Sequence, residues 1–205
     1  MKTEKTFLYT LARGIAAFLY PCVFLAKARG VENFPREENC IILSNHLSAW
    51  DPITIAHVYK HNEIHFIAKE SLFRNRALKW FLGRLHAFPV SRGEADLAAM
   101  RTALKVIADG HVLGIFPEGY RRHTPGWEPG KLETGVAVMA LRSRVPVVPV
   151  FIAGKYRIFG KIRVVVGTPL DMDDLRARRP DAQTLEEVKH RILDSWEALQ
   201  RQADW

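Results

Sequence analysis

A strand and a polar turn meet in residues 40–52, which read CIILSNHLSAWDP. The run from Cys40 to Ser44 is short and apolar, as expected of a buried strand. The turn ends at Asp51-Pro52, and proline suits the first turn of a helix. A strand, a polar loop and a helix in this order are typical of a layered α/β domain, in which the loops at strand ends carry the chemistry.

The rest of the chain repeats this alternation. Strand-like runs occupy residues 64–68, 86–90, 112–116, 147–152 and 162–166. Residues 94–109 place Leu97, Met100, Leu104 and Ile107 three or four residues apart, which is the apolar stripe of an amphipathic helix. Residues 132–142 and 184–202 have a similar pattern, and residues 52–60 read as a shorter helix. The pattern predicts a single α/β domain over residues 30–205 with a mostly parallel central sheet.

Length and composition are those of one globular domain. The chain has 205 residues, of which 48% are hydrophobic and 25% charged, and these values exclude a disordered tail, a collagen-like fibre and a polytopic membrane protein. The two cysteines, Cys22 and Cys40, show no CxxC spacing, so neither a zinc site nor a redox pair is expected. This cysteine usage favours a reducing compartment.

Positive charge is concentrated in the first 170 residues. The formal net charge is +8, made up of −3 over residues 171–205 and +11 over residues 1–170. A body this basic indicates an anionic partner, and charge alone leaves open a nucleic acid, an anionic membrane surface or a phosphorylated substrate.

An apolar segment covers residues 7–28, with Arg13 as its only charge before Lys27. It can be interpreted as a helix lying in the membrane interface, a single spanning helix or a cleaved signal peptide. A helix packed on its own domain is an alternative that overlaps with the first of these. Arg13 and Pro21 count against the spanning-helix and signal-peptide interpretations. We therefore expect residues 1–29 to be a membrane-associating segment with an apolar helix, which places the protein at the cytoplasmic face of a membrane as a peripheral or singly anchored protein.

His46 and Asp51 are the first candidates for catalysis. Asp51 is either the N-cap of the following helix or the partner of His46, since a tight turn can bring its carboxylate to one imidazole nitrogen. The sequence has no GxSxG elbow, and neither cysteine has a histidine nearby. A hydroxyl of the substrate is then the simplest nucleophile. Ser48 keeps a serine-hydrolase alternative open.

A second polar group follows the strand-like run at residues 112–116. Phe116-Pro117-Glu118-Gly119 suggests a turn with a buried carboxylate, and Arg121 can bind a phosphate or carboxylate through two parallel hydrogen bonds.

Together these groups resemble the glycerolipid acyltransferase family, which includes 1-acylglycerol-3-phosphate acyltransferase. The resemblance rests on the Asn-His-x-x-x-x-Asp box at residues 45–51 and the Phe-Pro-Glu-Gly box at residues 116–119. It extends over residues 30–170 through GVENFP at 30–35, FIAKESLF at 66–73, FPVSR at 88–92, PGKLETG at 129–135 and the proline block VPVVPV at 145–150. Tyr120 stands where the family usually has threonine, which leaves open the preferred acceptor.

The resemblance implies a glycerol-3-phosphate acyltransferase-like fold and transfer of a fatty acyl group from acyl-CoA or acyl carrier protein to the hydroxyl of a lysophospholipid, foremost lysophosphatidic acid. Alternative acceptors are lysophosphatidylglycerol, glycerol-3-phosphate and an amino-acid lysolipid. No cofactor and no metal are expected. The implied roles assign His46 as general base, Asp51 as its orienting group, and Asn45 and Pro117 as supports. Acceptor binding is assigned to Lys69, Arg92, Glu118, Gly119 and Arg121.

Other interpretations of the same residues stay open. Lys69, Arg92 and Arg121 can each be an ordinary surface cation. The basic body also suits a nucleic-acid-binding protein, which leaves the His-Asp box unexplained, or a catalytically inactive membrane-binding module. His57, His61 and His65 are spaced four apart, but they fall on a helix, a loop and a strand, and so are not expected to share a metal.

Overall fold

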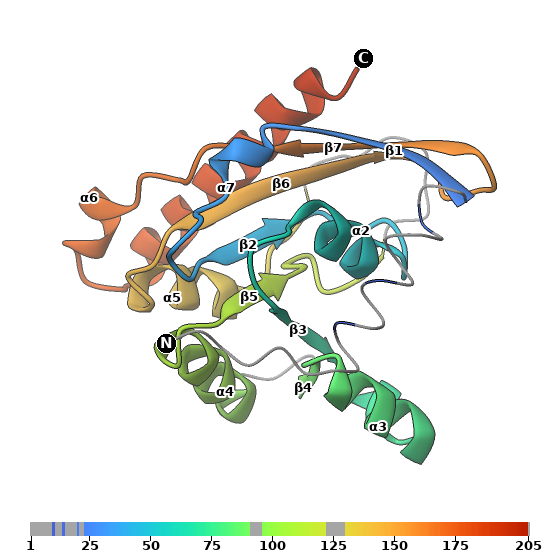
Figure 1. Cartoon of the computed structure of the whole chain (residues 1–205). Coiled ribbons are helices and arrows are strands. Elements are labelled where there is room, and N and C mark those ends of the chain that lie inside the picture. The colour runs from blue at the N-terminus through green and yellow to red at the C-terminus, as the bar shows by residue number, and fades with distance from the viewer. Residues whose placement is uncertain are drawn as a thin grey trace.

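A mostly parallel sheet forms the centre of the molecule (Figure 1). The computed structural model describes residues 23–90, 96–121 and 130–204, together with Thr10, Gly14 and Tyr20. Within these residues the strand order is β1-β7-β6-β2-β5-β3-β4. The strands are β1 (Phe24–Arg29), β2 (Ile41–Ser44), β3 (Ile64–Lys69), β4 (Phe88–Val90), β5 (Val112–Ile115), β6 (Val147–Gly154) and β7 (Gly160–Val166). All neighbouring pairs are parallel except β6 and β7, so the predicted α/β class with a mostly parallel central sheet is confirmed.

The helices cover both faces of this sheet (Figure 1). They are α2 (Asp51–Val58), α3 (Arg76–Arg84), α4 (Leu97–Ala108), α5 (Thr134–Arg142), α6 (Asp173–Arg176) and α7 (Ala182–Gln202), with short 3-10 turns η1 (Val31–Asn33) and η2 (Glu70–Phe73). Along the strand order, the connection from β2 to β3 runs toward the β4 edge, whereas the connection from β5 to β6 runs toward the β1 edge. Because such crossovers are right-handed, α2 and α5 lie on opposite faces of the sheet.

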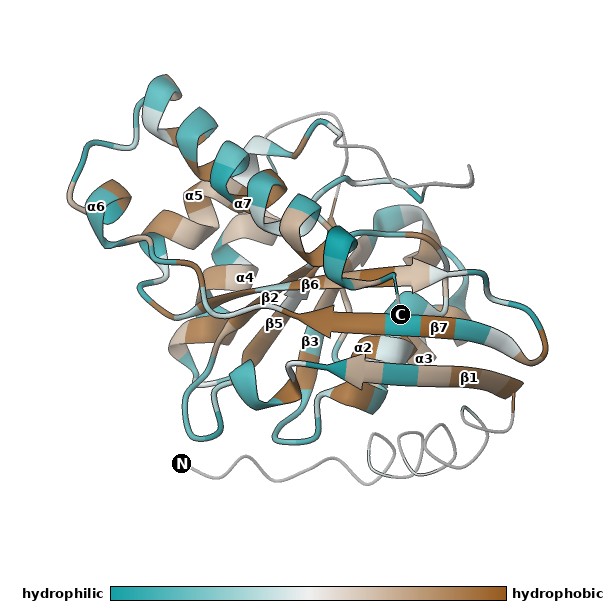
Figure 2. Cartoon of the chain, turned by 90° about the horizontal axis from the view of Figure 1, so that it is seen from above, coloured by the Kyte–Doolittle hydropathy of each residue, from teal (hydrophilic) through white to brown (hydrophobic). Residues whose placement is uncertain are grey.

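Strand β2 contributes side chains to both apolar clusters of the core, one on each face of the sheet. Ile41 and Leu43 belong to the apolar cluster under α4, α5 and α7, whereas Cys40 and Ile42 belong to the cluster on the α2 face. This alternation is the two-residue period of a strand buried on both sides. The central strands are accordingly brown in Figure 2, while α7 turns a largely teal surface outward.

Strand β1 departs from the sequence-based expectation. Phe24–Arg29 was expected within the apolar N-terminal segment, yet it is an edge strand that runs parallel to β7, with Phe24 opposite Gly160 and Arg29 opposite Val165. These six residues therefore belong to the sheet. A continuous apolar run lacks the alternation that distinguishes a strand from a helix, which explains the error.

The remainder of the predicted membrane-associating segment lies largely outside the described residues. Tyr20 is described and is buried. None of the helices in the described part of the chain has the length and apolarity needed to cross a bilayer.

Candidate active site

The loop after β2 is fixed to the neighbouring strand by Asn45. Its side-chain amide donates to the Ile152 carbonyl at 2.9 Å, and its Oδ1 accepts from the Ile152 N–H at 2.7 Å. Asn45 is fully buried, and these two bonds continue the β2–β6 ladder beyond its last backbone pair, Ser44 with Val150. The residue that follows, His46, therefore begins from a rigid position at the carboxyl edge of the sheet.

His46 and Asp51 form a hydrogen-bonded pair. Nδ1 of His46 lies 2.7 Å from Oδ2 of Asp51, whose side chain is fully buried while that of His46 is 14% exposed. The same Oδ2 accepts from the backbone N–H groups of Leu47 at 2.6 Å and Ser48 at 2.7 Å. Trp50 is the N-cap of α2 and Asp51 its first residue, so the carboxylate binds the preceding loop instead of capping its own helix.

The turn after β5 completes the site from a second strand. Oε2 of Glu118 accepts from the backbone N–H of His46 at 3.1 Å, and Glu118 is buried, as the sequence suggested. The Phe116 ring stacks on the imidazole with centroids 4.3 Å apart. Gly119 takes a left-handed backbone conformation with φ 72°, which glycine adopts without strain, and its N–H donates to the Phe116 carbonyl at 3.1 Å. The pair is thus held from both strands.

The other predicted residues that the structure describes lie around this centre. The Pro117 carbonyl accepts from the Glu133 N–H at 2.9 Å, which ties the turn to the start of α5. Lys69 is exposed at the end of β3, and Arg121 is exposed directly after the Glu118 turn. Both lie at the His46 edge because β2, β3 and β5 are parallel. Arg92 lies outside the described residues.

A chain of hydroxyls lies beside Asp51 and leaves no recognisable pattern in the sequence. Thr54 Oγ1 donates to the Trp50 carbonyl at 3.0 Å and lies 2.6 Å from the Tyr20 hydroxyl and 2.7 Å from that of Tyr156. Thr54 has a single proton, so both tyrosines donate to it. Burial and then the charge of Asp51 raise the pKa of Tyr156, which keeps it protonated. No local motif marks Tyr156, since its partner is 102 residues away.

Other polar candidates have different surroundings. Ser48 Oγ accepts from the Trp50 N–H at 3.3 Å. His57 lies on α2 and His65 on β3, where the His65 ring contacts His86 and His111. The described residues contain no group of three or more His, Cys, Asp or Glu arranged to hold a metal ion.

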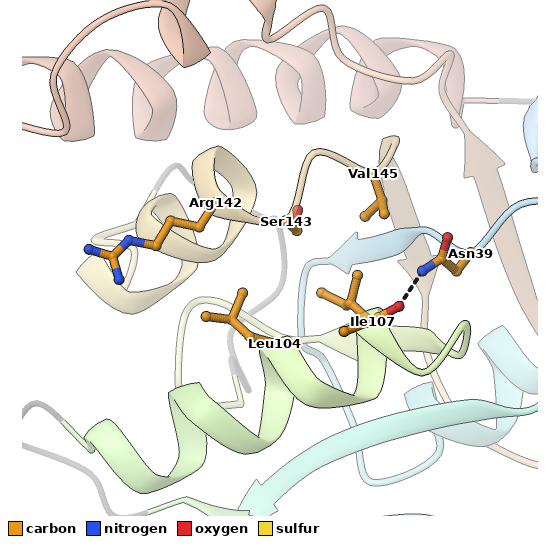
Figure 3. A pocket seen from close by; sticks show the side chains of 7 residues that line it. Asn39, Leu104, Ile107, Arg142, Ser143 and Val145 are labelled. Carbon is orange, nitrogen blue, oxygen red and sulfur yellow. Dashed lines mark hydrogen bonds between the residues drawn. The ribbon is translucent and has the colours of Figure 1, made fainter.

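A shallow groove lies at the opposite edge of the sheet (Figure 3). It is lined by Asn39 before β2, Ile107 near the end of α4 and Val145 before β6, with Leu104, Ala108, Arg142 and Ser143. A hydrogen bond from the Asn39 amide to the Ile107 carbonyl joins two of these residues. Since His46 follows the other end of β2, this groove is not part of the site.

The arrangement defines an enzyme with a His-Asp pair at the carboxyl edge of a mostly parallel sheet, which is where α/β proteins bind their ligands. A family model for acyltransferases matches residues 26–153. The chain therefore belongs to the acyltransferase family, and the resemblance inferred from its two boxes is confirmed.

Relatives and a solved structure agree with this assignment. A 1-acyl-sn-glycerol-3-phosphate acyltransferase of Bacillus subtilis is 29% identical over 183 residues, which cover 87% of this chain and 89% of the relative. One of Streptococcus pneumoniae is 26% identical, with 93% and 72% covered. The crystal structure of the 1-acyl-sn-glycerophosphate (LPA) acyltransferase PlsC from Thermotoga maritima has a TM-score of 0.68 at 22% identity, over 97% of this chain and 79% of that one, and shares the fold.

Proposed function

We propose that the protein transfers a fatty acyl group from an acyl thioester, acyl-CoA or acyl carrier protein, to the free hydroxyl of lysophosphatidic acid, giving phosphatidic acid. The observation that carries the proposal is the His46–Asp51 hydrogen bond at the carboxyl edge of the sheet. Relatives of this family that bear the name 1-acyl-sn-glycerol-3-phosphate acyltransferase support the acceptor.

In the proposed reaction His46 acts as general base and then as general acid. It takes the hydroxyl proton as the acceptor oxygen forms a bond to the thioester carbonyl carbon, and it returns that proton to the thiolate when the C–S bond breaks. Because Nδ1 is engaged by Asp51, Nε2 is the nitrogen that exchanges the proton. Asp51 fixes the tautomer and ring orientation and stabilises the imidazolium that forms.

The proposed acceptor site is the basic rim around this pair. Lys69, Arg92 and Arg121 are its candidate phosphate ligands, with Glu118 and Gly119 shaping the turn. A phosphate at this rim accounts for part of the excess positive charge of residues 1–170. The amide of Gly119 is already bonded to Phe116, so the thioester oxyanion needs another donor.

Incubation with defined substrates tests the function. The purified protein is mixed with acyl-CoA or acyl carrier protein thioesters and with lysophosphatidic acid, lysophosphatidylglycerol, glycerol-3-phosphate or an amino-acid lysolipid, and the products are read by mass spectrometry. We expect phosphatidic acid as the main product and none with His46→Ala. Preferential acylation of another acceptor would contradict the substrate, and no acylated product with any pair would contradict the activity.

A further inference from the structure

The edge of the sheet that carries His46 also carries most of the exposed large apolar side chains among the described residues. These are Leu25, Trp50, Leu72, Leu78, Trp80, Phe81, Tyr120, Ile158 and Phe159. Each lies close to the carboxyl end of one of β2, β3, β5 and β6, or near the beginning of β1 or β7 at the same edge. Helix α3 stays there because β4, which follows it, pairs with the last three residues of β3. Both α3 and the β6–β7 turn lie at the right-hand side of Figure 1.

Helix α3 has an apolar face that the described part of the chain covers only partly. Leu78, Phe81, Leu82 and Leu85 follow one another at helical spacing, and no residue of α3 is buried. Leu78 is 36% exposed and Phe81 is 44% exposed. A helix of nine residues gains little stability by itself, so an apolar face of this kind is expected to find a partner.

The other side of α3 is cationic. It carries Arg76, Lys79 and Arg84, and the Arg84 guanidinium lies 5.4 Å from the centre of the Trp80 ring, which is 58% exposed. Residues 71–93 contain no Asp or Glu. Apolar side chains on one face, and cations together with an exposed aromatic ring on the other, are features of a helix that lies in a membrane interface.

The turn between β6 and β7 presents a second apolar tip. Ile158 is 73% exposed and Phe159 is 68% exposed. Phe159 has a left-handed backbone with φ 57°, which is unfavourable for a bulky residue, and its N–H donates to the Val23 carbonyl at 2.8 Å. Lys155 and Arg157 lie next to the tip, and residues 134–170 contain no Asp or Glu. The backbone thus holds an aromatic side chain in water beside two cations.

We propose that α3 and the β6–β7 turn dock the carboxyl edge of the sheet onto an anionic lipid bilayer. Two separate elements each combine apolar side chains with neighbouring cations, which matches a partner with an apolar interior and an anionic surface. Docking in this orientation turns the His46 edge toward the lipid. The docking itself stands apart from acyl transfer and involves residues outside the catalytic pair.

Position-specific labelling tests this orientation in the full chain. Cys22→Ser removes one thiol, and burial raises the pKa of the remaining Cys40 to about 12, so an added cysteine is labelled selectively. A polarity-sensitive fluorophore is attached at Phe81→Cys or Ile158→Cys, with Arg142→Cys at the opposite edge as the control. On vesicles of phosphatidylcholine and phosphatidylglycerol, nitroxide-labelled lipids should quench the fluorophores at positions 81 and 158. They should leave the fluorophore at position 142 unquenched. Labels at 81 and 158 that stay water-accessible on bound protein would overturn the proposal.

Paired substitutions measure the energetics of docking without substrate. Leu78→Ser with Phe81→Ser, and Ile158→Ser with Phe159→Asn, should each weaken partitioning to anionic vesicles about tenfold or more, from lost apolar burial. Asparagine tolerates the left-handed backbone at position 159. Arg142→Ser with Arg179→Ser, exposed at the far edge, should leave partitioning unchanged.

The outcomes separate docking from catalysis. All variants should acylate a short, water-soluble lysolipid as the parent does. A parent inactive on every acceptor refutes the proposed function and leaves the vesicle result standing. Unchanged partitioning of both apolar pairs overturns the docking proposal. The docking proposal is also overturned if the parent self-associates in a concentration-dependent way and both apolar double variants abolish this self-association. That result would assign the surface to a second copy of the chain.

Discussion

At the scale of single residues, one oxygen of Asp51 positions the catalytic loop. Oδ2 accepts from the His46 ring and from the Leu47 and Ser48 amides, while Oδ1 is buried with no hydrogen-bond partner in the described part of the chain. The carboxylate sits in the first turn of α2, where the helix dipole favours negative charge. The loop is therefore shaped by the same carboxylate that, in the proposed mechanism, orients His46.

This arrangement predicts that His46 and Asp51 act as a unit. His46→Ala should lower the rate on the order of 10²–10⁴-fold, the usual contribution of a positioned acid-base group. Asp51→Asn should lose less, and the double variant should be no slower than His46→Ala, because an orienting group has no effect without the imidazole. Steady-state rates of the three variants measure these losses, and their thermal unfolding temperatures control for loss of folding. If the rate loss of the double variant equalled the product of the two single losses, Asp51 would have a role separate from His46.

Arg121 tests the acceptor phosphate. If Arg121 binds the acceptor phosphate as proposed, Arg121→Lys keeps the charge and loses one of two parallel bonds, so we expect a loss of roughly 1–3 kcal/mol in kcat/KM with lysophosphatidic acid. With a neutral lysolipid the loss should vanish. Comparing kcat/KM for the two acceptors measures the difference, and equal losses would assign Arg121 to the fold.

Gly114 is connected to His46 through a row of aromatic rings. An alanine Cβ there would lie 2.4 Å from the Phe66 ring, which stacks on Phe116, which stacks on His46. Gly114→Ala should cost about 1–3 kcal/mol of unfolding free energy and lower activity further by tilting the imidazole. Gly135→Ala is the matched control, since its Cβ meets only Met100 at 3.8 Å. Unaltered kcat for Gly114→Ala would show that the rings do not position His46.

At the scale of elements, β1 and β7 form an edge that continues the sheet toward the N-terminal segment. Tyr20 packs on Phe24 with ring centroids 5.2 Å apart and bonds to Thr54 on α2. The sheet therefore begins earlier in the chain than the sequence pattern indicates, and a truncation meant to remove only a membrane segment has to stop before Tyr20.

Two truncations should behave differently. Removing residues 1–19 should preserve the melting temperature and activity toward a water-soluble acceptor, while weakening flotation with anionic liposomes through loss of apolar area. Removing residues 1–29 also deletes β1 and uncovers β7, so unfolding should occur at a clearly lower temperature. Calorimetry and flotation compare them. Equal melting temperatures would contradict the contribution of β1, and full flotation of the shorter truncation would contradict the anchoring role.

At the scale of the whole molecule, a histidine cluster couples stability to pH. Burial, reinforced by His86 and His111, lowers the pKa of His65 from its ordinary value of 6.5 to about 4, and Asp109 opposes this weakly. His86 in turn pairs with the buried Glu63 at 2.8 Å. His65 is neutral when folded and takes up a proton more readily when unfolded.

The folded protein should therefore lose stability as pH falls from about 6.5 to 4. The contribution of His65 is fully present above its unfolded pKa and decreases by at most about 3 kcal/mol over this window, with no further loss below it. Urea unfolding across this pH range measures the slope. His65→Gln should flatten it, and an unchanged slope in that variant would assign the pH dependence to other groups.

The sequence by itself determined the features that lie within a short window of the chain. The alternation of apolar runs predicted six of the strands and the main helices, and the spacing of His46 and Asp51 predicted their contact. These are local properties, because a period of two or of 3.6 and a five-residue turn leave their pattern in adjacent residues.

Tertiary structure decided the contacts between distant segments. Glu118 reaches His46 across 72 residues, Asn45 reaches Ile152 across 107, and Phe24–Arg29 is a strand because β7 pairs with it. Tertiary structure also left the apolar face of α3 only partly covered by the described residues, at the edge that carries the site. Such features depend on which segments become neighbours in space, and no window of the sequence records this.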